Sequence, residues 1–164
     1  YEELVKLPAE GKGTMVGYLL KNTASLHGTV SRGVCKVKDG KLDTIQEALK
    51  VQLYPDGHLT DLDTDTDLAP DTVVSMNFWG FMPSIFPALR TYFENFLRGL
   101  PDDAMKAECL LPVMVNDLLA SGEMTVLATP SHDKWFGITY KADKEDVENK
   151  LKALHESGVY PPQL

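Results

Sequence analysis

The sequence lacks the features that mark several large classes of protein. Its 164 residues contain no apolar run close to the roughly 20 residues that cross a bilayer. It has only two cysteines, Cys35 and Cys109, which are too few for a disulfide framework and both sit among apolar neighbours. These absences predict a cytoplasmic protein with reduced thiols, a core that forms without cross-links, and no interaction with a membrane.

Basic charge is also scarce. The chain carries 24 acidic and 16 basic side chains, a net charge of −8, and no basic stripe alternates with aromatic residues. The negative electrostatic field of such a chain repels a polyanion, so the composition argues against binding to nucleic acid. A small phosphorylated ligand is still compatible, because a few local cations or a metal ion can hold one. Length and composition fit a single globular domain over residues 1–164, and the oligomeric state stays open.

Several catalytic motifs are missing as well. There is no G-x-G-x-x-G, no phosphate loop of the G-x-x-x-x-G-K-[ST] type and no G-x-S-x-G elbow. The histidines are scattered without the spacing of a metal pair, at positions His27, His58, His132 and His155. Hydrolytic and dinucleotide-dependent chemistry therefore has no support in the sequence.

The pattern of apolar residues predicts alternating strands and helices. Strands are expected over residues 14–20, 34–37, 42–45, 50–54, 73–81, 125–128 and 135–139. Helices are expected at the start of the chain (1–7), from Pro83 to Gly99, over 110–120, and from Asp143 to near Gly158. Asp39-Gly40 between two short alternating runs indicates a hairpin. Together these elements predict a layered α/β domain with the 34–54 hairpins as an antiparallel appendage.

The acidic stretch Asp61–Asp67 places a carboxylate at every second position. Such carboxylates could converge on calcium, as in a calcium-binding interaction protein. The sixth and twelfth positions are Thr66 and Thr72, however, rather than the glycine and bidentate glutamate of a calcium loop. An exposed acidic loop is the favoured interpretation, and calcium binding is the alternative.

Three polar positions stand out among apolar neighbours. Asn77 lies inside the apolar run 73–81, where a buried amide needs either a backbone partner or a ligand hydroxyl. Glu47 lies in the apolar stretch 45–49, and an exposed edge carboxylate is the alternative there. Asp133 and Lys134 precede Trp135 at the expected start of a strand, where α/β sheets form ligand sites or simply salt-bridged loops.

Taken in order, three segments resemble one family. They are residues 32–41, the aromatic-rich run 76–83 and residues 135–143. Together they are similar to sugar-phosphate nucleotidyltransferases, which join a nucleoside triphosphate to a sugar 1-phosphate in nucleotide-sugar biosynthesis. The resemblance spans roughly residues 14–156. It implies a layered α/β/α, Rossmann-like mixed sheet.

The resemblance also implies a site and a reaction. The sugar phosphate oxygen would attack the α-phosphorus of the triphosphate, pyrophosphate would leave, and Mg²⁺ would neutralise the developing charge. The partners would be a nucleoside triphosphate and a sugar 1-phosphate. By position, the implied roles are sugar binding by Gly33, Glu47 and Asn77, phosphate binding by Lys50 or Lys141, substrate binding by Trp135 near the metal ligand, and metal binding by Asp133.

Three departures from the family pattern narrow these expectations. The family's metal-binding aspartate stands two positions after the tryptophan, where this chain has Gly137, and Ala48 replaces the lysine that commonly follows the glutamate. The family's glycine-rich nucleotide loop does not occur in the 164 residues. The chain therefore resembles the C-terminal part of such an enzyme and is expected to be inactive alone, and a non-catalytic sugar-binding module is the alternative. The nucleotide base and the acceptor stay open, phosphocholine included.

Overall fold

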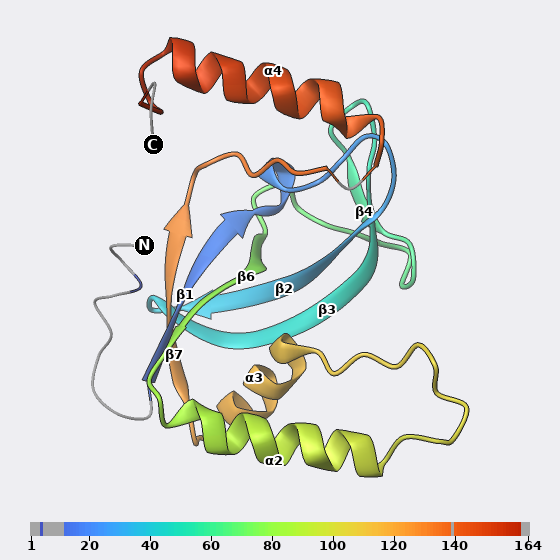
Figure 1. The fold of residues 1–164 in the computed structure, drawn as a ribbon, viewed down its shortest axis with the longest axis vertical. Coiled ribbons are helices and arrows are strands. Elements are labelled where there is room, and N and C mark those ends of the chain that lie inside the picture. The colour runs from blue at the N-terminus through green and yellow to red at the C-terminus, as the bar shows by residue number, and fades with distance from the viewer. Residues whose placement is uncertain (1–3, 5–11, 139, 162–164) are drawn as a thin grey trace.

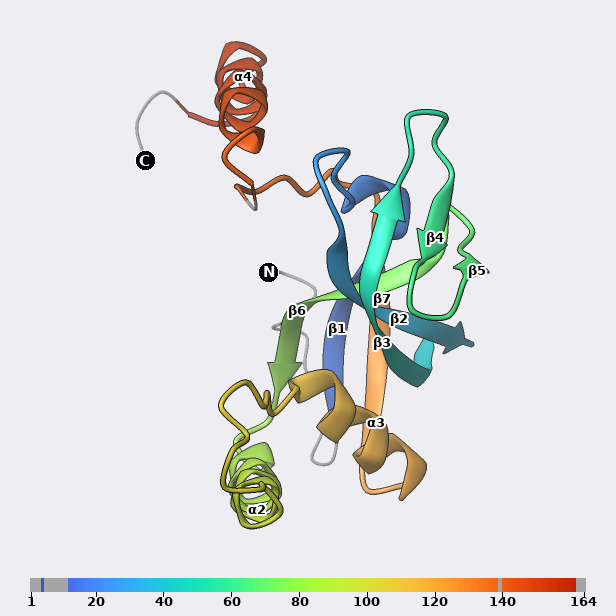
Figure 2. The same ribbon diagram turned by 90° about the vertical axis from the view of Figure 1, so that its right-hand side faces the viewer.

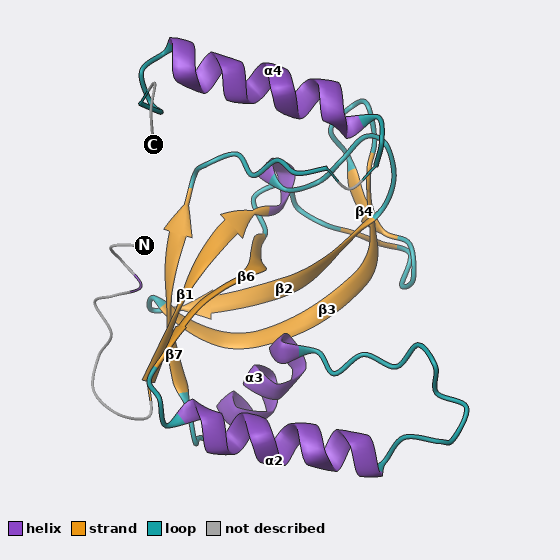
Figure 3. Ribbon diagram, in the orientation of Figure 1, coloured by secondary structure: helices purple, strands orange, loops and turns teal. Residues whose placement is uncertain are grey.

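A computed structural model describes residues 4, 12–138 and 140–161 of the chain. Apart from Leu4, the helix expected over residues 1–7 lies outside the described residues. Strands occupy the middle of the molecule and helices lie at its ends (Figure 3). The strands are β1 (Lys12–Leu19), β2 (Val30–Lys38), β3 (Lys41–Leu53), β4 (Leu59–Asp61), β5 (Thr66–Asp67), β6 (Val73–Phe81) and β7 (Thr125–Ser131). The helices are η1 (Leu20–Asn22), α2 (Ile85–Arg98), α3 (Leu111–Ala120) and α4 (Asp143–Glu156).

The sheet closes on itself. Its strand order is β2-β6-β1-β7-β3-β4-β5, and β3 also pairs with β2, so five strands form a closed ring (Figure 1). The described strands β1 and β7 run parallel, and the other neighbours run antiparallel. The expectation of a layered, Rossmann-like α/β/α sheet is therefore wrong. The predicted hairpin appendage instead closes the sheet, because β2 pairs with β6 and β3 meets β7.

The long strand β3 explains why the sequence pattern was misleading. It has 13 residues and merges the two strands expected over 42–45 and 50–54. Its buried positions recur every third residue rather than every second. Register shifts against β2 lie between Leu42 and Ile45 and between Ala48 and Val51, and from Ile45 to Ala48 burial passes from one core cluster to the other. The strand thereby supplies two cores. Leu42 and Ile45 pack with Met15, Cys35, Val115 and Val126, whereas Ala48 and Val51 pack with Leu20, Val30, Leu59 and Val74.

The helices do not cover the two faces of a flat sheet. α2 and α3 lie at one end of the molecule, and α4 stands off at the other (Figure 2). Met114 and Val115 of α3 are buried, and the Asn116 side-chain oxygen accepts a hydrogen bond from the Ile45 backbone at 3.0 Å. All three helices begin and end close to the residues predicted for them. No helix in the described part of the chain is long and apolar enough to cross a membrane.

The strand expected over residues 135–139 is a second wrong prediction. Residues 132–138 have no regular secondary structure, and Thr139 lies outside the described residues. The segment is held by a hydrogen bond from the Trp135 backbone to the Asn22 carbonyl at 3.1 Å. The indole ring folds back over Gly137, where an added Cβ would lie 2.7 Å from the ring. With the Trp135 ring folded over Gly137, this segment does not follow the extended path of a strand.

Candidate functional site

Three of the predicted sugar-binding residues lie close together across three neighbouring strands. Gly33 of β2 is paired in register with Glu47 of β3 on one side and with Ser75 of β6 on the other. Two strand spacings separate Glu47 from Ser75, a backbone distance of roughly 10 Å. Asn77 follows Ser75 by two residues on β6. Gly33 is 14 residues before Glu47 and 42 residues before Ser75 in the sequence. The strand pairing therefore brings three separate segments into one row across the sheet.

The glycine in the middle of this row has a packing role. A Cβ on Gly33 would lie 2.8 Å from Cδ1 of Ile45 and 3.3 Å from Cβ of Ser75. The space that a side chain would occupy is thus filled by a core isoleucine. Close packing is therefore a sufficient reason for a glycine at this position. A contact between Gly33 and a ligand stays a prediction.

Asn77 sits on a bulge of β6. Gly17 pairs with Ser75 and Met15 with Trp79, so one residue of β1 faces three residues of β6. Asn77 adopts a φ of 55°, in the left-handed region that asparagine tolerates better than most side chains. Its side-chain oxygen accepts from Trp79 Nε1 at 3.2 Å, and the residue is exposed. The expectation of a buried amide is therefore wrong. The Nδ2 group makes no hydrogen bond to the residues described.

Glu47 is a half-buried carboxylate in the middle of β3. Within the described part of the chain, neither a hydrogen bond nor an ion pair holds its oxygens. Burial raises the pKa of Glu47 above its ordinary value, and the attraction of Arg32 opposes that rise. A carboxylate that is costly to bury and lacks a protein partner is available to a ligand.

A cavity of about 240 Å³ adjoins Glu47. The loop between β4 and β5 folds back over β3 to form one wall, and the Leu62 backbone donates to the Lys50 carbonyl at 3.0 Å. The lining combines amide, carboxylate and hydroxyl groups with a small apolar surface, from Val34, Gln46, Glu47, Ala48, Asp61, Thr64, Thr66 and Leu68. A mixture of donors and acceptors beside apolar contacts suits a ligand with several hydroxyls.

Sequence reasoning did not identify most of this cavity. The sequence predicted no ligand-binding role for Gln46, Thr64 or Thr66, although both threonines lie in the acidic stretch Asp61–Asp67. Only the pairing of β3 with β4 brings the acidic loop back beside Glu47. The alternation of aspartate with threonine over residues 63–67 is the available signal in the sequence, and by itself it indicates an exposed acidic loop.

A contact between Arg32 and Trp135 joins the first and the third of the resembling segments. Arg32 is 8% exposed, and its guanidinium lies under the Trp135 ring, with 5.2 Å from Cζ to the ring centroid. Its Nε donates to the Thr23 hydroxyl at 3.1 Å, and its Nη2 donates to the Thr23 carbonyl. Trp135 thereby packs against β2, although β2 and residue 135 are far apart in sequence.

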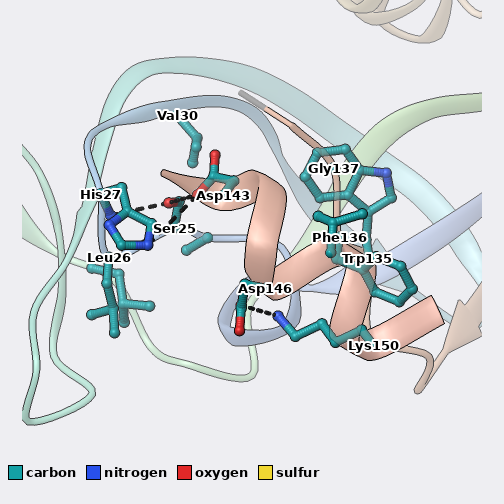
Figure 4. Close-up of a pocket in the computed structure, with 13 residues that line it drawn as sticks. Ser25, Leu26, His27, Val30, Trp135, Phe136, Gly137, Asp143, Asp146 and Lys150 are labelled. Carbon is teal, nitrogen blue, oxygen red and sulfur yellow. Dashed lines mark hydrogen bonds and ion pairs between the residues drawn. The ribbon is translucent and has the colours of Figure 1, made fainter. Parts of the chain in front are cut away.

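A second cavity, of about 200 Å³, is lined in part by Trp135 (Figure 4). Ser25 donates to Asp143 at 3.2 Å, and His27 points toward the same carboxylate at 3.9 Å. Lys150 pairs with Asp146 at 2.7 Å. The contacts of Ser25 and His27 tie the start of α4 to the loop after η1, whereas the Lys150–Asp146 pair lies within α4. The polar groups of this cavity are therefore used within the protein.

The predicted phosphate and metal ligands do not join the row at Gly33. Lys50 pairs with Asp63 at 2.6 Å, and Lys141 is exposed just before α4. Asp133 is exposed and accepts from the Ser131 hydroxyl at 2.9 Å. Nowhere in residues 12–138 and 140–161 do three histidine, cysteine, aspartate or glutamate side chains group as a metal site. The described residues thus do not fit a magnesium site at Asp133.

The acidic loop uses its carboxylates within the protein. Asp61 is buried and accepts from the Asp63 backbone at 3.1 Å and from the Thr64 hydroxyl at 2.9 Å. Asp67 lies 3.0 Å from the His58 ring. These contacts form the tight turn between β4 and β5, and they direct the carboxylates toward separate partners rather than one centre.

Comparison with known proteins gives no family assignment. No protein-family model matches the chain, and no curated protein matches its sequence. The resemblance to sugar-phosphate nucleotidyltransferases therefore stays a prediction that rests on the residues quoted above.

Proposed function

We propose that this chain binds a phosphorylated sugar in the cavity beside Glu47, as the acceptor-binding part of a sugar-phosphate nucleotidyltransferase. The observation that carries the proposal is the state of Glu47, a half-buried carboxylate without a hydrogen-bonding partner among the described residues. Leaving a carboxylate partly desolvated and unpaired costs stability, which a ligand hydroxyl would offset by donating to it.

Two further features support a sugar as the ligand. The cavity wall offers the Gln46 amide and the Thr64 and Thr66 hydroxyls, which pair well with the alternating hydroxyls of a sugar ring. The exposed Asn77 amide lies on the far side of Gly33 from Glu47, and its Nδ2 group donates to none of the described residues. Neither feature identifies which sugar is bound.

In this proposal the chain positions the acceptor and leaves the triphosphate to another glycine-rich segment. Orienting the sugar phosphate for in-line attack on the α-phosphorus would be its main contribution to rate. No catalytic step is assigned to Asp133, because the described residues beside it do not form a metal site. Nucleoside triphosphates and sugar phosphates are cytoplasmic metabolites, and the free thiols of Cys35 and Cys109 are compatible with that compartment.

Isothermal titration calorimetry with a panel of sugar 1-phosphates tests the proposal. We expect at least one to bind, with Glu47→Gln and Gln46→Ala each weakening binding by about tenfold, the loss of one charge-assisted or well-placed hydrogen bond. The matched control is Glu108→Gln, the same chemical change at an exposed position outside the cavity. If no sugar 1-phosphate binds, or if Glu108→Gln weakens binding as much as Glu47→Gln does, the proposal is wrong.

A sugar-binding module without catalytic activity is the second candidate. It is favoured by Gly137, which packs against the Trp135 ring at the position where the family carries a metal-binding aspartate. Release of pyrophosphate from a nucleoside triphosphate and a bound sugar 1-phosphate separates the two candidates. The chain alone should bind the sugar without releasing pyrophosphate, and addition of a glycine-rich nucleotide-binding part should restore release only if the chain belongs to an enzyme.

A further inference from the structure

Helix α2 carries large apolar side chains that the described part of the chain leaves uncovered. Phe86, Phe93 and Leu97 are 66%, 50% and 49% exposed. At about 100° per residue these positions fall within roughly 40° of one another around the helix axis, so they form one straight row along α2. Single exposed apolar residues are common on protein surfaces, but three aligned along one helix mark an interaction surface.

A different stripe of α2 attaches the helix to the rest of the protein. Ile85 is buried, and Leu89 and Phe96 are half-buried. These positions lie roughly 80° around the helix axis from the exposed row. α2 lies at one end of the molecule (Figure 2), and a surface helix needs only one apolar stripe to pack onto its own core. The exposed row is therefore free for a partner.

Arg90 belongs to the same row. Its side chain is exposed and lies within about 40° of Phe86 and Leu97 around the axis. Its Nε donates to Glu94 at 3.2 Å, and Glu94 also accepts from Arg98 at 3.3 Å. One carboxylate thus serves two guanidinium groups. With these two arginines and one glutamate, α2 has a net charge of +1, whereas the whole chain has a net charge of −8.

The α2 row, made of Phe86, Arg90, Phe93 and Leu97, is complementary to itself in reverse. Its members stand symmetrically about the midpoint of the helix, which falls between residues 91 and 92. An antiparallel copy of α2 with the same midpoint would therefore set Phe86 against Leu97, and Arg90 against the ring of Phe93. Two-fold symmetry repeats each contact, giving two apolar pairs and two cation–aromatic pairs along the full length of the helix.

The distribution of charge also favours a second copy. Two chains of net charge −8 repel each other across most of their surfaces, and this repulsion is smallest where the local charge is not acidic. α2, with its net charge of +1, is such a place. An anionic membrane would attract the arginines of α2, but it would repel the acidic remainder of the chain.

The size of the α2 row sets the strength of the pairing. A large apolar side chain covers about 150–250 Å² when it is fully buried, so three that are about half exposed offer on the order of 300 Å² per copy. A stable interface buries about 800 Å² per partner. The pairing should therefore be weak and reversible, with a dissociation constant on the order of 100 μM.

We propose that α2 is the interface of a weak homodimer, in which two copies of this chain pair antiparallel through the α2 row. The described lining of the cavity beside Glu47 comes from residues 34–68 and includes none of α2. The pairing is therefore separate from the proposed sugar binding, and either can hold without the other.

Sedimentation equilibrium of the full chain, from about 10 μM to about 1 mM, tests the pairing. The average mass of the wild type should rise from 18.2 kDa toward twice that value. Leu97→Glu, which sets a carboxylate against Phe86, should stay monomeric. The matched control is Leu151→Glu, the same change at an exposed position of α4, and it should associate as the wild type does. A wild type that stays monomeric, or a Leu151→Glu protein that dissociates as much as Leu97→Glu, would overturn the proposal.

Circular dichroism checks that each variant folds. If Leu97→Glu does not fold, Arg90→Glu takes its place, because its side chain is largely in solvent and the change sets a carboxylate against the Phe93 ring. Arg90→Glu should also stay monomeric, and association as strong as that of the wild type would count against the α2 row as the interface.

Cross-linking tests the antiparallel order. Phe86→Cys and Leu97→Cys are made separately in a Cys109→Ser background, mixed in equal amounts at a concentration where the wild type is paired, and oxidised mildly. Cys35 is buried and should not react. The disulfide between positions 86 and 97 should exceed the share expected from random pairing, as read by intact mass. A predominance of links between two copies of the same variant would refute the antiparallel order.

Other occupants of the α2 row give different results. If the wild type is monomeric and co-sediments with vesicles of phosphatidylserine and phosphatidylcholine, and Leu97→Glu does not, the row binds a membrane surface and the homodimer is wrong. Sugar 1-phosphates should bind Leu97→Glu as they bind the wild type, because residue 97 lies outside the cavity beside Glu47. If no sugar 1-phosphate binds either protein, the proposed function fails and sedimentation still decides on the dimer.

Discussion

Replacing Glu47 with glutamine should make the protein more stable at neutral pH. The carboxylate is half-buried, has no hydrogen-bonding partner among the described residues, and has a raised pKa because burial outweighs the attraction of Arg32. The folded protein therefore binds the Glu47 proton more tightly than the unfolded chain does. The stability from this proton is full below the ordinary carboxyl pKa and is lost as pH rises through the raised one. At neutral pH the ionised side chain is a net cost, which glutamine removes.

The expected gain is about 0.5–1 kcal/mol in the free energy of unfolding, because solvent still screens a half-buried charge. In a domain of this size that is a rise in Tm of roughly 1–4 °C. Urea unfolding of wild type and Glu47→Gln, measured from mildly acidic to neutral pH, gives the difference directly. Glu108→Gln, at an exposed position without a resolved contact, is the control and should leave stability unchanged.

The pH dependence is what separates this account from a general effect of the substitution. The difference in stability between the two proteins should grow as pH rises and should be small at acidic pH, where Glu47 is protonated. A Glu47→Gln protein that is less stable than the wild type at neutral pH would refute the reasoning. So would a difference that does not change with pH.

Three smaller predictions concern packing. Gly33→Ala should lower the free energy of unfolding by about 1–3 kcal/mol in urea titrations, because its Cβ would collide with Ile45; no loss would contradict the close packing. Gly137→Ala should displace the Trp135 ring and red-shift its fluorescence in a Trp79→Phe background, and an unchanged spectrum would argue against the folded-back ring. Cys35, buried and with its thiol pKa raised to about 12, should resist alkylation until the protein unfolds, as read by intact mass.

Local signals in the sequence predicted the three described α-helices and several strands, but not how the strands assemble. The Asp39-Gly40 turn between β2 and β3 is confirmed, with both residues at positive φ as such a hairpin turn requires. Helix α2, predicted from Pro83 to Gly99, is confirmed at Ile85–Arg98. These features depend on a few adjacent residues, which is why a single sequence reveals them.

The closure of the sheet could not be read in the same way. Strand β3 buries Leu42, Ile45, Ala48 and Val51 at intervals of three, which matches neither the period of a regular strand nor that of a helix. Its pairing partners lie on β2, β4 and β7, at positions that no local pattern specifies. A layered sheet was the natural expectation for alternating elements, and only the long-range pairing shows otherwise.

The candidate site, too, is predictable from the sequence only where the signal is local. Glu47 was identified because an acidic residue in an apolar stretch is a local anomaly, visible without any structure. Gln46, Thr64 and Arg32 were missed because an amide, a hydroxyl or a cation in a polar or mixed segment is unremarkable. Their importance comes from the fold, which places the β4–β5 loop over β3 and the Trp135 ring over Arg32.

The most direct test of the central claim is a map of amide chemical-shift changes during a titration with sugar 1-phosphates. The account predicts that the shifts centre on Gln46, Glu47, Thr64 and Thr66, and that Glu47→Gln abolishes or greatly weakens them. Shifts centred instead on the cavity between Ser25 and Lys150, or no shifts up to about 10 mM ligand, which bounds the binding free energy near −3 kcal/mol, would contradict it.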